Sequence, residues 1–191
     1  MSMNNIKKLS FYDFDGTLAD SPLPEEGKKQ WSEAYGKPYP HIGWWGRAES
    51  LDIRVFEIEL FDTTEKLARQ DISDPETLAF ILTSRMEKLR PALEAVLDYH
   101  GIRFDGVDMK SGSETKGQKI LNYISKYPDV VRVDVYDDNY EREIVDFKSI
   151  RSQIPSHIQF NIFHADNGQF TLIKESYNIQ NIIQEEIEKL L

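Results

Sequence analysis

The sequence predicts an α/β protein, a three-layer α/β/α sandwich around a mostly parallel sheet. Short apolar runs alternate along the chain with segments of helical periodicity, which is typical of a parallel sheet with helical crossovers. Several of these runs end in acidic or hydroxyl residues, and open parallel sheets bind ligands at the carboxyl ends of their strands. With 191 residues, the chain can bury a core without disulfides, and it contains no cysteine.

In the amino-terminal half, residues 9–13 predict the first strand. Residues 21–75 form a middle section whose start, rich in proline, indicates a loop; its later part predicts a helix at residues 63–70. Residues 78–83 predict the second strand, and the helix after it stops at Gly101. The apolar side chains expected to be buried here are Leu9, Phe11, Tyr12, Phe61, Leu67, Leu89, Leu93, Val96 and Leu97.

In the carboxyl-terminal half, residues 104–109 are a weaker strand candidate, and a helix begins near Thr115. A strand follows at residues 131–137, then a helix over residues 140–150. Two further strands flank a turn at Asp166-Asn167-Gly168. Val131, Val133 and Val135 are the β-branched residues that indicate the strand at residues 131–137. The residues of this half expected to be buried are Ile120, Leu121, Ile124, Ile144 and Phe147.

These elements divide the chain into a domain over residues 1–175 and a terminal amphipathic helix over residues 176–191. Residues 21–75 are a small insertion on the substrate side of that domain, too short and irregular for a large cap, so we expect an open site. The apolar stripe of the terminal helix indicates that it packs on the domain formed by residues 1–175, and a dimer contact is the alternative. We therefore expect the protein to be a monomer or a weak dimer.

The composition narrows the functional classes. The formal net charge of −10 disfavours non-specific binding of duplex nucleic acid, although one terminal phosphate could still bind in a local pocket. No segment resembles a signal peptide or a membrane span, so we expect a soluble, cytoplasmic protein that does not bind membranes. Part of the negative charge would be functional if the site holds magnesium, which prefers carboxylates.

The first chemical motif is Asp13-Phe14-Asp15-Gly16-Thr17. Residues two apart on a strand point the same way, so Asp13 and Asp15 can face one site. Gly16 permits a tight turn with backbone N–H groups directed at an anion. This arrangement suits a nucleophile, an acid/base partner, a cation and a phosphate; the alternative is a surface turn, in which Asp-Gly is common.

Hydroxyl and cationic side chains end the second predicted strand. The Thr83 and Ser84 hydroxyls could bind phosphate oxygens, or could cap the following helix. Arg85 adds a planar fork of donors that matches phosphate, although a solvated surface arginine is an equal alternative.

A lysine and an acidic pair complete the set. Lys116 lies at a helix start, where it could neutralise charge on a carboxylate nucleophile and a phosphoryl group. Lys119 is the competing candidate and Lys110 a more distant one. Asp137 and Asp138 are adjacent carboxylates that repel each other unless a cation lies near them, and magnesium would resolve this conflict; an acidic surface turn is the alternative.

In their order, these segments resemble the haloacid dehalogenase superfamily of phosphohydrolases over residues 6–150. The chain is further similar to the RNA-repair and phage branch of this superfamily and to the phosphatase half of polynucleotide kinase-phosphatases. The segments that carry this similarity are Gly43-Trp44-Trp45, Leu82-Thr83-Ser84-Arg85, Phe104-Asp105 and Tyr136-Asp137-Asp138. The chain departs from that branch at Ser84, usually glycine there, and at Asn139, often arginine.

The resemblance implies a Rossmann-like fold and a role for each motif. Asp13 would be the nucleophile, Asp15 the acid/base, Thr83 the phosphate-orienting hydroxyl and Lys116 the charge-neutralising lysine. The remaining members of the site would bind substrate through Gly16, Thr17, Ser84 and Arg85, and Mg²⁺ through Asp13, Asp15, Asp137 and Asp138.

The expected function is magnesium-dependent hydrolysis of a phosphomonoester through an aspartyl-phosphate, with a nucleic-acid end as the preferred substrate. A small-molecule, nucleotide-like phosphatase and a non-catalytic binding module are the alternatives. For Trp31, Trp44 and Trp45 we favour core packing of the insertion over a platform for base stacking.

Overall fold

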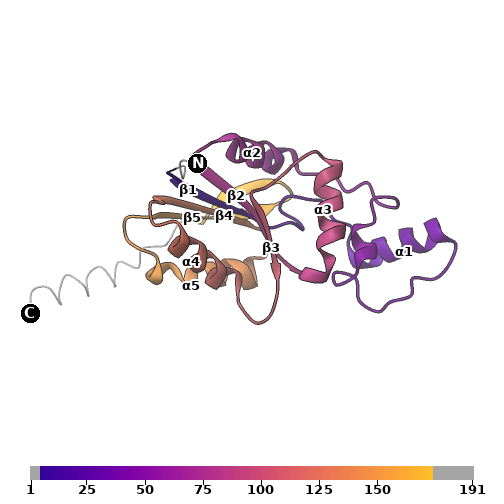
Figure 1. The fold of residues 1–191 in the computed structure, drawn as a ribbon. Helices are drawn as coiled ribbons and strands as arrows, with labels where there is room; N and C mark the ends of the chain where they lie inside the picture. The colour runs from indigo at the N-terminus through magenta and orange to yellow at the C-terminus, as the bar shows by residue number, and fades with distance from the viewer. Residues whose placement is uncertain (1–4, 174–191) are drawn as a thin grey trace, which may run out of the picture.

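A computed structural model describes residues 5–173 of the chain. Its centre is a six-stranded sheet with the order β3-β2-β1-β4-β5-β6, in which only β6 is antiparallel to its neighbour (Figure 1). The predicted α/β class is therefore confirmed. The strands are β1 (Lys8–Tyr12), β2 (Thr77–Met86), β3 (Gly106–Lys110), β4 (Arg132–Asp137), β5 (Gln159–Asp166) and β6 (Gln169–Leu172).

Helices cover both faces of this sheet and make the three layers. Side chains alternate along β1, so that Tyr12 packs beneath α2 and α3 and Phe11 packs beneath α4 and α5. Both side chains are almost fully buried, and each belongs to a separate apolar cluster. The helices are α1 (Pro24–Tyr35), α2 (Asp62–Ser73), α3 (Arg90–Tyr99), α4 (Lys116–Lys126) and α5 (Val145–Ser149).

Strand β2 is longer than predicted. Its pairing with β1 ends at Ile81, but the strand continues to Met86, and its register against β3 shifts between Leu82 and Met86. Such a break in register, like a β-bulge, re-aims the side chains within it. Thr83, Ser84 and Arg85 therefore lie inside an irregular strand end, not after it.

The expectation of a loop at the start of the insertion was wrong, because helix α1 begins at Pro24. Proline suits the first helical position, where its missing N–H loses nothing, and Gly36 closes the helix with a φ of +65°. Gly27 and Trp31 form the buried face of α1. A Cβ at Gly27 would lie 2.1 Å from the Trp44 ring, so the helix approaches that tryptophan as closely as glycine allows.

The later elements agree with prediction in type. The segment after β4 begins as a π-helical turn over Tyr140–Ile144 and continues as α5, with Ile144 and Phe147 buried as expected. Strands β5 and β6 form the predicted hairpin, whose turn places Asn167 and Gly168 at positive φ. The predicted terminal helix lies outside the described residues.

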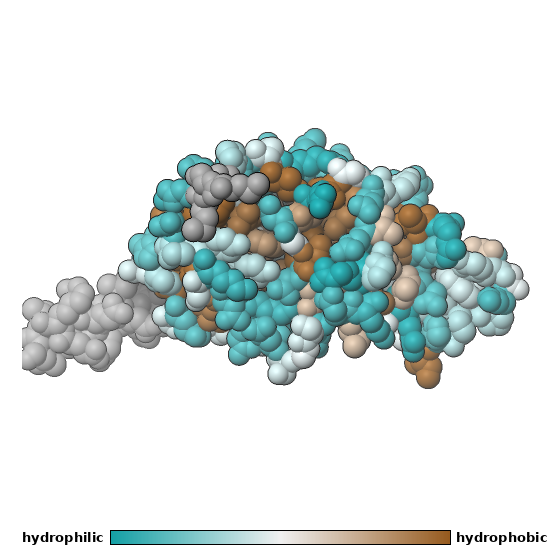
Figure 2. Space-filling model, in the orientation of Figure 1, coloured by the Kyte–Doolittle hydropathy of each residue, from teal (hydrophilic) through white to brown (hydrophobic). Residues whose placement is uncertain are grey.

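Figure 2 shows a largely hydrophilic face, on which apolar side chains gather mainly over the sheet between its helical layers. Among residues 5–173, no helix has both the length and the apolar content that a membrane crossing requires.

Candidate active site

Strand β1 delivers the first motif to the carboxyl edge of the sheet. The Asp13 N–H continues the ladder by donating to the Tyr136 carbonyl at 2.9 Å, and the Asp13 residue is 8% exposed. Gly16 turns the chain at a φ of +71°, and a Cβ there would lie 2.5 Å from Asp138 Oδ2. Glycine is thus required both by the backbone and by the close approach of Asp138.

Helix α4 places Lys116 against the first motif. Thr115 caps the helix by accepting from the Gln118 N–H, while the Gln118 side chain accepts from the Thr115 N–H. This capping box fixes Lys116 in the first turn, where its Nζ lies 2.9 Å from Asp13 Oδ1 and 2.7 Å from Asp137 Oδ2. The buried ammonium therefore bridges the first and last motifs.

The structure separates the competing lysines. Lys119 is also buried, but its ammonium pairs with Asp108 and donates to the Met109 carbonyl at 2.8 Å, on strand β3. Lys110 is exposed at the end of β3. Among the described residues, Lys116 is the lysine that contacts Asp13.

Three carboxylates gather at this point. Asp13, Asp137 and Asp138 each offer an oxygen, and these oxygens lie within 4.8 Å of one another. Both Asp137 oxygens are engaged, one by Lys116 and the other by the Asn139 N–H at 2.9 Å. Buried Asp13 Oδ1 accepts no hydrogen bond of good geometry, so the donor set fits a hard divalent cation, with Asp13 and Asp138 as the more available ligands.

The electrostatics of the cluster also favour a cation. Burial, with smaller contributions from Asp137 and Asp15, raises the pKa of Asp13 from 3.8 to about 7 despite the opposing charge of Lys116. Burial and then Asp13 raise the pKa of Asp138 to about 6, and burial also raises the pKa of Asp137. Burial alone would lower the pKa of Lys116, but Asp13 and Asp137 outweigh it and raise that pKa.

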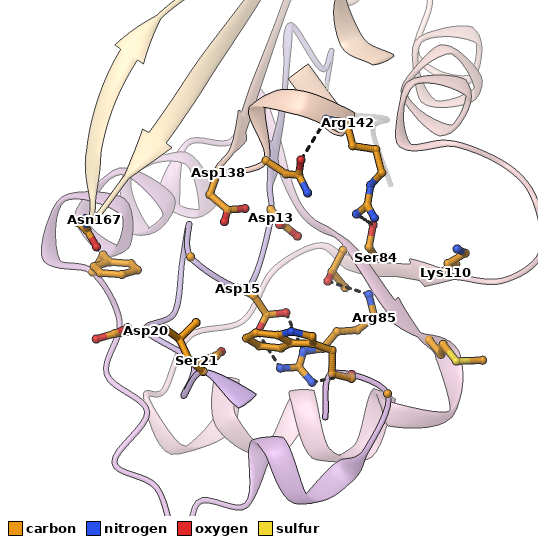
Figure 3. Close-up of a pocket in the computed structure, with 18 of the residues that line it drawn as sticks. Asp13, Asp15, Asp20, Ser21, Ser84, Arg85, Lys110, Asp138, Arg142 and Asn167 are labelled. Carbon is orange, nitrogen blue, oxygen red and sulfur yellow. Dashed lines mark hydrogen bonds and ion pairs between the residues drawn. The ribbon is translucent and has the colours of Figure 1, made fainter. Parts of the chain in front are cut away.

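Arg85 holds the second carboxylate of the first motif. Its guanidinium donates from Nε to Asp15 Oδ2 and from Nη2 to Asp15 Oδ1, both at 2.7 Å, which is a bidentate pair. The third nitrogen, Nη1, donates to Ser50 Oγ at 2.7 Å and to the Trp45 carbonyl at 3.1 Å. Arg85 therefore joins the acid/base candidate to the insertion, and none of its three nitrogens is left without a protein acceptor (Figure 3).

The predicted hydroxyls lie in different environments. Thr83 lines the cavity, and its Oγ1 accepts from the Arg85 N–H at 3.2 Å. Ser84 also lines it, but its Oγ donates to Glu143 Oε1 at 3.0 Å and accepts from Arg142 at 3.1 Å. Thr17 is fully buried and does not reach the cavity wall; its carbonyl accepts from the Thr64 hydroxyl and so anchors α2.

Around these groups lies an open cavity of about 870 Å³ (Figure 3). Of the three tryptophans, Trp31 and Trp44 are buried in the core, whereas Trp45 is 40% exposed and lines the cavity. Core packing therefore describes two of them and not the third. Sequence reasoning did not find several of the other lining residues, which come from loops and from the segment after β4: Asp20, Ser21, Asn139, Arg142 and Asn167.

Fold and site together define a haloacid dehalogenase-type hydrolase domain, as the motifs suggested. The chain belongs to the family described as HAD domain family 1 in Swiss Army Knife RNA repair proteins, whose match covers residues 35–188. That stretch contains Thr83, Lys116, Asp137 and Asp138. Asp13 lies before it and is connected to the family's segment by the contacts described above.

Individual relatives are more distant. An uncharacterized Saccharomyces cerevisiae protein, YMR265C, is 27% identical over 173 residues, which cover 75% of this chain and 37% of that protein. The chain thus spans little more than a third of this curated relative.

Three solved structures share the fold. The first is a Streptococcus pneumoniae haloacid dehalogenase-like hydrolase, SP0104, with a TM-score of 0.51 and 17% identity over 83% of this chain and 84% of that chain. The second is the HAD domain of the Legionella pneumophila effector Lem4, with a TM-score of 0.52 and 13% identity over 95% of this chain and 94% of that chain. The third is a chain of a Pnkp1/Rnl/Hen1 complex, with a TM-score of 0.50 and 16% identity over 86% of this chain and 48% of that chain.

Proposed function

We propose that this domain is a magnesium-dependent phosphomonoesterase that acts through an aspartyl-phosphate on Asp13, with the phosphorylated end of a nucleic acid as its substrate. The observation that carries the proposal is the position of Asp13, which lies between the Lys116 ammonium and the acidic pair at one open cavity. A nucleophilic carboxylate, a neutralising cation and a metal-binding cluster are the parts that phosphoryl transfer requires.

In the proposed first step, an Asp13 oxygen bonds to phosphorus as the bond from phosphorus to the leaving oxygen breaks. Protonated Asp15 transfers its proton to that leaving oxygen. Asp15 then takes a proton from water, whose oxygen attacks phosphorus and releases inorganic phosphate and free Asp13. Magnesium held by Asp13 and Asp138 would neutralise the charge on the transferred group, and Lys116 would stabilise the anionic form of the nucleophile and orient it.

The Asp15–Arg85 pair adds a requirement to this mechanism. Both Asp15 oxygens accept hydrogen bonds from Arg85 in this pair, so neither oxygen is free to carry a proton to the leaving group. We therefore expect Asp15 to leave Arg85 when substrate binds, so that the freed guanidinium can contact the phosphate. Trp45 and Ser50, which hold the same guanidinium, couple this exchange to the insertion.

Two observations support a nucleic-acid end over other phosphomonoesters. The family's description places it in RNA repair proteins. The open cavity, with exposed Trp45 in its wall, can also admit a bulky leaving group and offers an aromatic surface to a base.

The test offers the purified protein an aryl phosphate, nucleotides, and oligonucleotides phosphorylated at the 3′ or 5′ end, with magnesium and with chelator. We expect magnesium-dependent release of phosphate, fastest from oligonucleotide ends. A preference for nucleotides would indicate the small-molecule phosphatase. A folded protein that hydrolyses none of these would contradict the proposal and favour a binding module.

Substitution of the two buried lysines should separate their roles. We expect Lys116→Ala to lower kcat by about 10²- to 10³-fold, because it removes the positive charge beside the nucleophile. Lys119→Ala should retain most of the activity, because Lys119 pairs on β3 away from Asp13. Steady-state kinetics on the aryl phosphate measures both, with circular dichroism to establish that each variant is folded; equal losses in two folded variants would refute the assignment of Lys116.

A further inference from the structure

A second cavity continues from the first beyond Ser84. It has a volume of about 430 Å³ and shares five wall residues with the first cavity, so the two form one trough. The second cavity is lined mainly by the loop after β3, the start of α4 and the segment after β4. The shared residues are Thr83, Ser84, Lys110, Gly112 and Arg142.

Two cations stand where the cavities join. Lys110 is exposed and makes no hydrogen bond or ion pair with any residue from 5 to 173. The Arg142 side chain is 64% exposed; its guanidinium pairs with Glu143 and donates to Ser84 Oγ, which directs it along the wall. Exposed cations on a chain of net charge −10 are positioned to bind an anion from solution.

The acidic residues around this junction are already engaged. Glu143 accepts from Ser84 and Arg142, and Asp146 accepts the Gly117 N–H at 2.7 Å. Glu114, at the far side of the second cavity, accepts from Asn122.

The opposite end of the first cavity has a different character. Asp20, Phe61 and Asn167 line it and offer no cation. Figure 3 shows Asn167 and Lys110 at opposite ends, with Asp13 and Asp15 between them. An extended anionic ligand that places one phosphate at Asp13 is therefore attracted toward Lys110 and repelled from Asp20.

We propose that Lys110 and Arg142 form a subsite for a second phosphate group, which binds the phosphodiester next to the terminal phosphate of a nucleic-acid strand. The strand would then leave the active site over Ser84 into the second cavity. This inference rests on the proposed function and adds the direction of the strand. A nucleoside bisphosphate offers the same second phosphate, so the test must distinguish these two sources.

The test compares kcat/KM for an aryl phosphate, a nucleoside monophosphate, a nucleoside bisphosphate and a tetranucleotide with the same phosphorylated end. We expect Lys110→Ala to lower the tetranucleotide-to-aryl phosphate ratio by about 3- to 10-fold, and Lys110→Ala/Arg142→Ala to lower it further. The tetranucleotide rate of the double variant should also depend less steeply on salt. Lys29→Ala, an exposed lysine on α1 outside both cavities, is the matched control and should leave the ratio unchanged.

The outcomes distinguish failure of the proposed phosphatase function from failure of the second phosphate subsite. If the folded wild-type protein hydrolyses none of the four substrates, the proposed function fails, whatever the variants do. If it does hydrolyse the aryl phosphate and Lys110→Ala leaves the ratio unchanged, the subsite is refuted alone. A loss confined to the bisphosphate would assign the second phosphate to a small molecule and overturn the assignment to a strand.

Discussion

Asp13→Asn should abolish turnover and at the same time stabilise the metal-free protein at neutral pH. An amide is not a nucleophile toward phosphorus, so we expect kcat to fall by roughly 10⁴-fold or more. The gain in stability has a separate origin, because Asp13 is a buried carboxylate beside two others and its neutral isostere avoids that repulsion. Lys116 keeps Asp137 as its partner in the variant.

The sign of the pH dependence follows from the raised pKa of Asp13. The unfolded chain releases this proton near pH 3.8 and the folded protein near pH 7, so the folded state binds more protons between these values. Its stability therefore decreases as pH rises through that window. Asp13→Asn removes this loss, and its advantage should grow from pH 4 to a plateau above pH 7 of about 4 kcal/mol, which is the free energy that corresponds to a difference of about 3 between the folded and unfolded pKa values.

Denaturant unfolding in chelator at pH 5 and pH 8 measures this advantage, and phosphate release from an aryl phosphate measures turnover. Asp98→Asn, on the exposed face of α3, is the control for removal of one negative charge. An Asp13→Asn variant that hydrolyses the aryl phosphate at the wild-type rate would exclude Asp13 as nucleophile. A variant less stable than wild type at pH 8 would contradict the account of the buried cluster.

Asp15→Asn should also lose activity, but with the opposite effect on stability. Arg85 has a side chain only 2% exposed, and Asp15 supplies its counter-charge through two hydrogen bonds of 2.7 Å. Removing that charge leaves a buried guanidinium without an anion, which we expect to cost about 2 to 4 kcal/mol, since Asp15 itself is partly exposed. Loss of the acid/base group should lower kcat by about 10²- to 10⁴-fold.

The double variant Asp15→Asn/Arg85→Met is the sharper stability experiment. Replacing both partners removes the unpaired charge, so the double variant should recover most of the stability that Asp15→Asn loses, while activity stays low. Urea unfolding of the wild type, both single variants and the double variant gives the coupling energy. If the changes in the free energy of unfolding caused by the two substitutions are additive, the Asp15–Arg85 pair contributes nothing to stability. That result would also remove the basis for an exchange of Arg85 between Asp15 and substrate.

The fold was predictable from features that act locally. Alternating apolar residues identified β4, a glycine turn identified the β5–β6 hairpin, and an apolar stripe identified the helix that begins near Thr115 as α4. Helix α1 was missed because the prolines in this segment were interpreted as a sign of a loop, whereas Pro24 starts the helix and Gly36 ends it. The register shift in β2 was missed because register depends on the neighbouring strand, and the sequence of one strand does not specify its neighbour.

The candidate site was predictable as a set of positions but not as a set of contacts. Asp13, Lys116 and Asp137 were selected separately. In the structure, the Lys116 ammonium lies 2.9 Å from an Asp13 oxygen and 2.7 Å from an Asp137 oxygen. The pairing of Arg85 with Asp15 could not be read from sequence, because the two are separated by 70 residues and Arg85 had a phosphate-binding interpretation of its own. Arg142 belongs to none of the motifs, so the sequence offered no reason to select it.

Magnesium titration by calorimetry tests most directly the claim that four distant segments meet around one cation. Wild-type protein should bind one Mg²⁺ in the absence of substrate. Asp13→Asn and Asp138→Asn should each weaken that binding by about tenfold or more, which corresponds to at least 1.4 kcal/mol, while Asp98→Asn binds as wild type. Binding that is unchanged in the folded Asp13→Asn and Asp138→Asn variants would contradict the account, because the metal would then lie elsewhere.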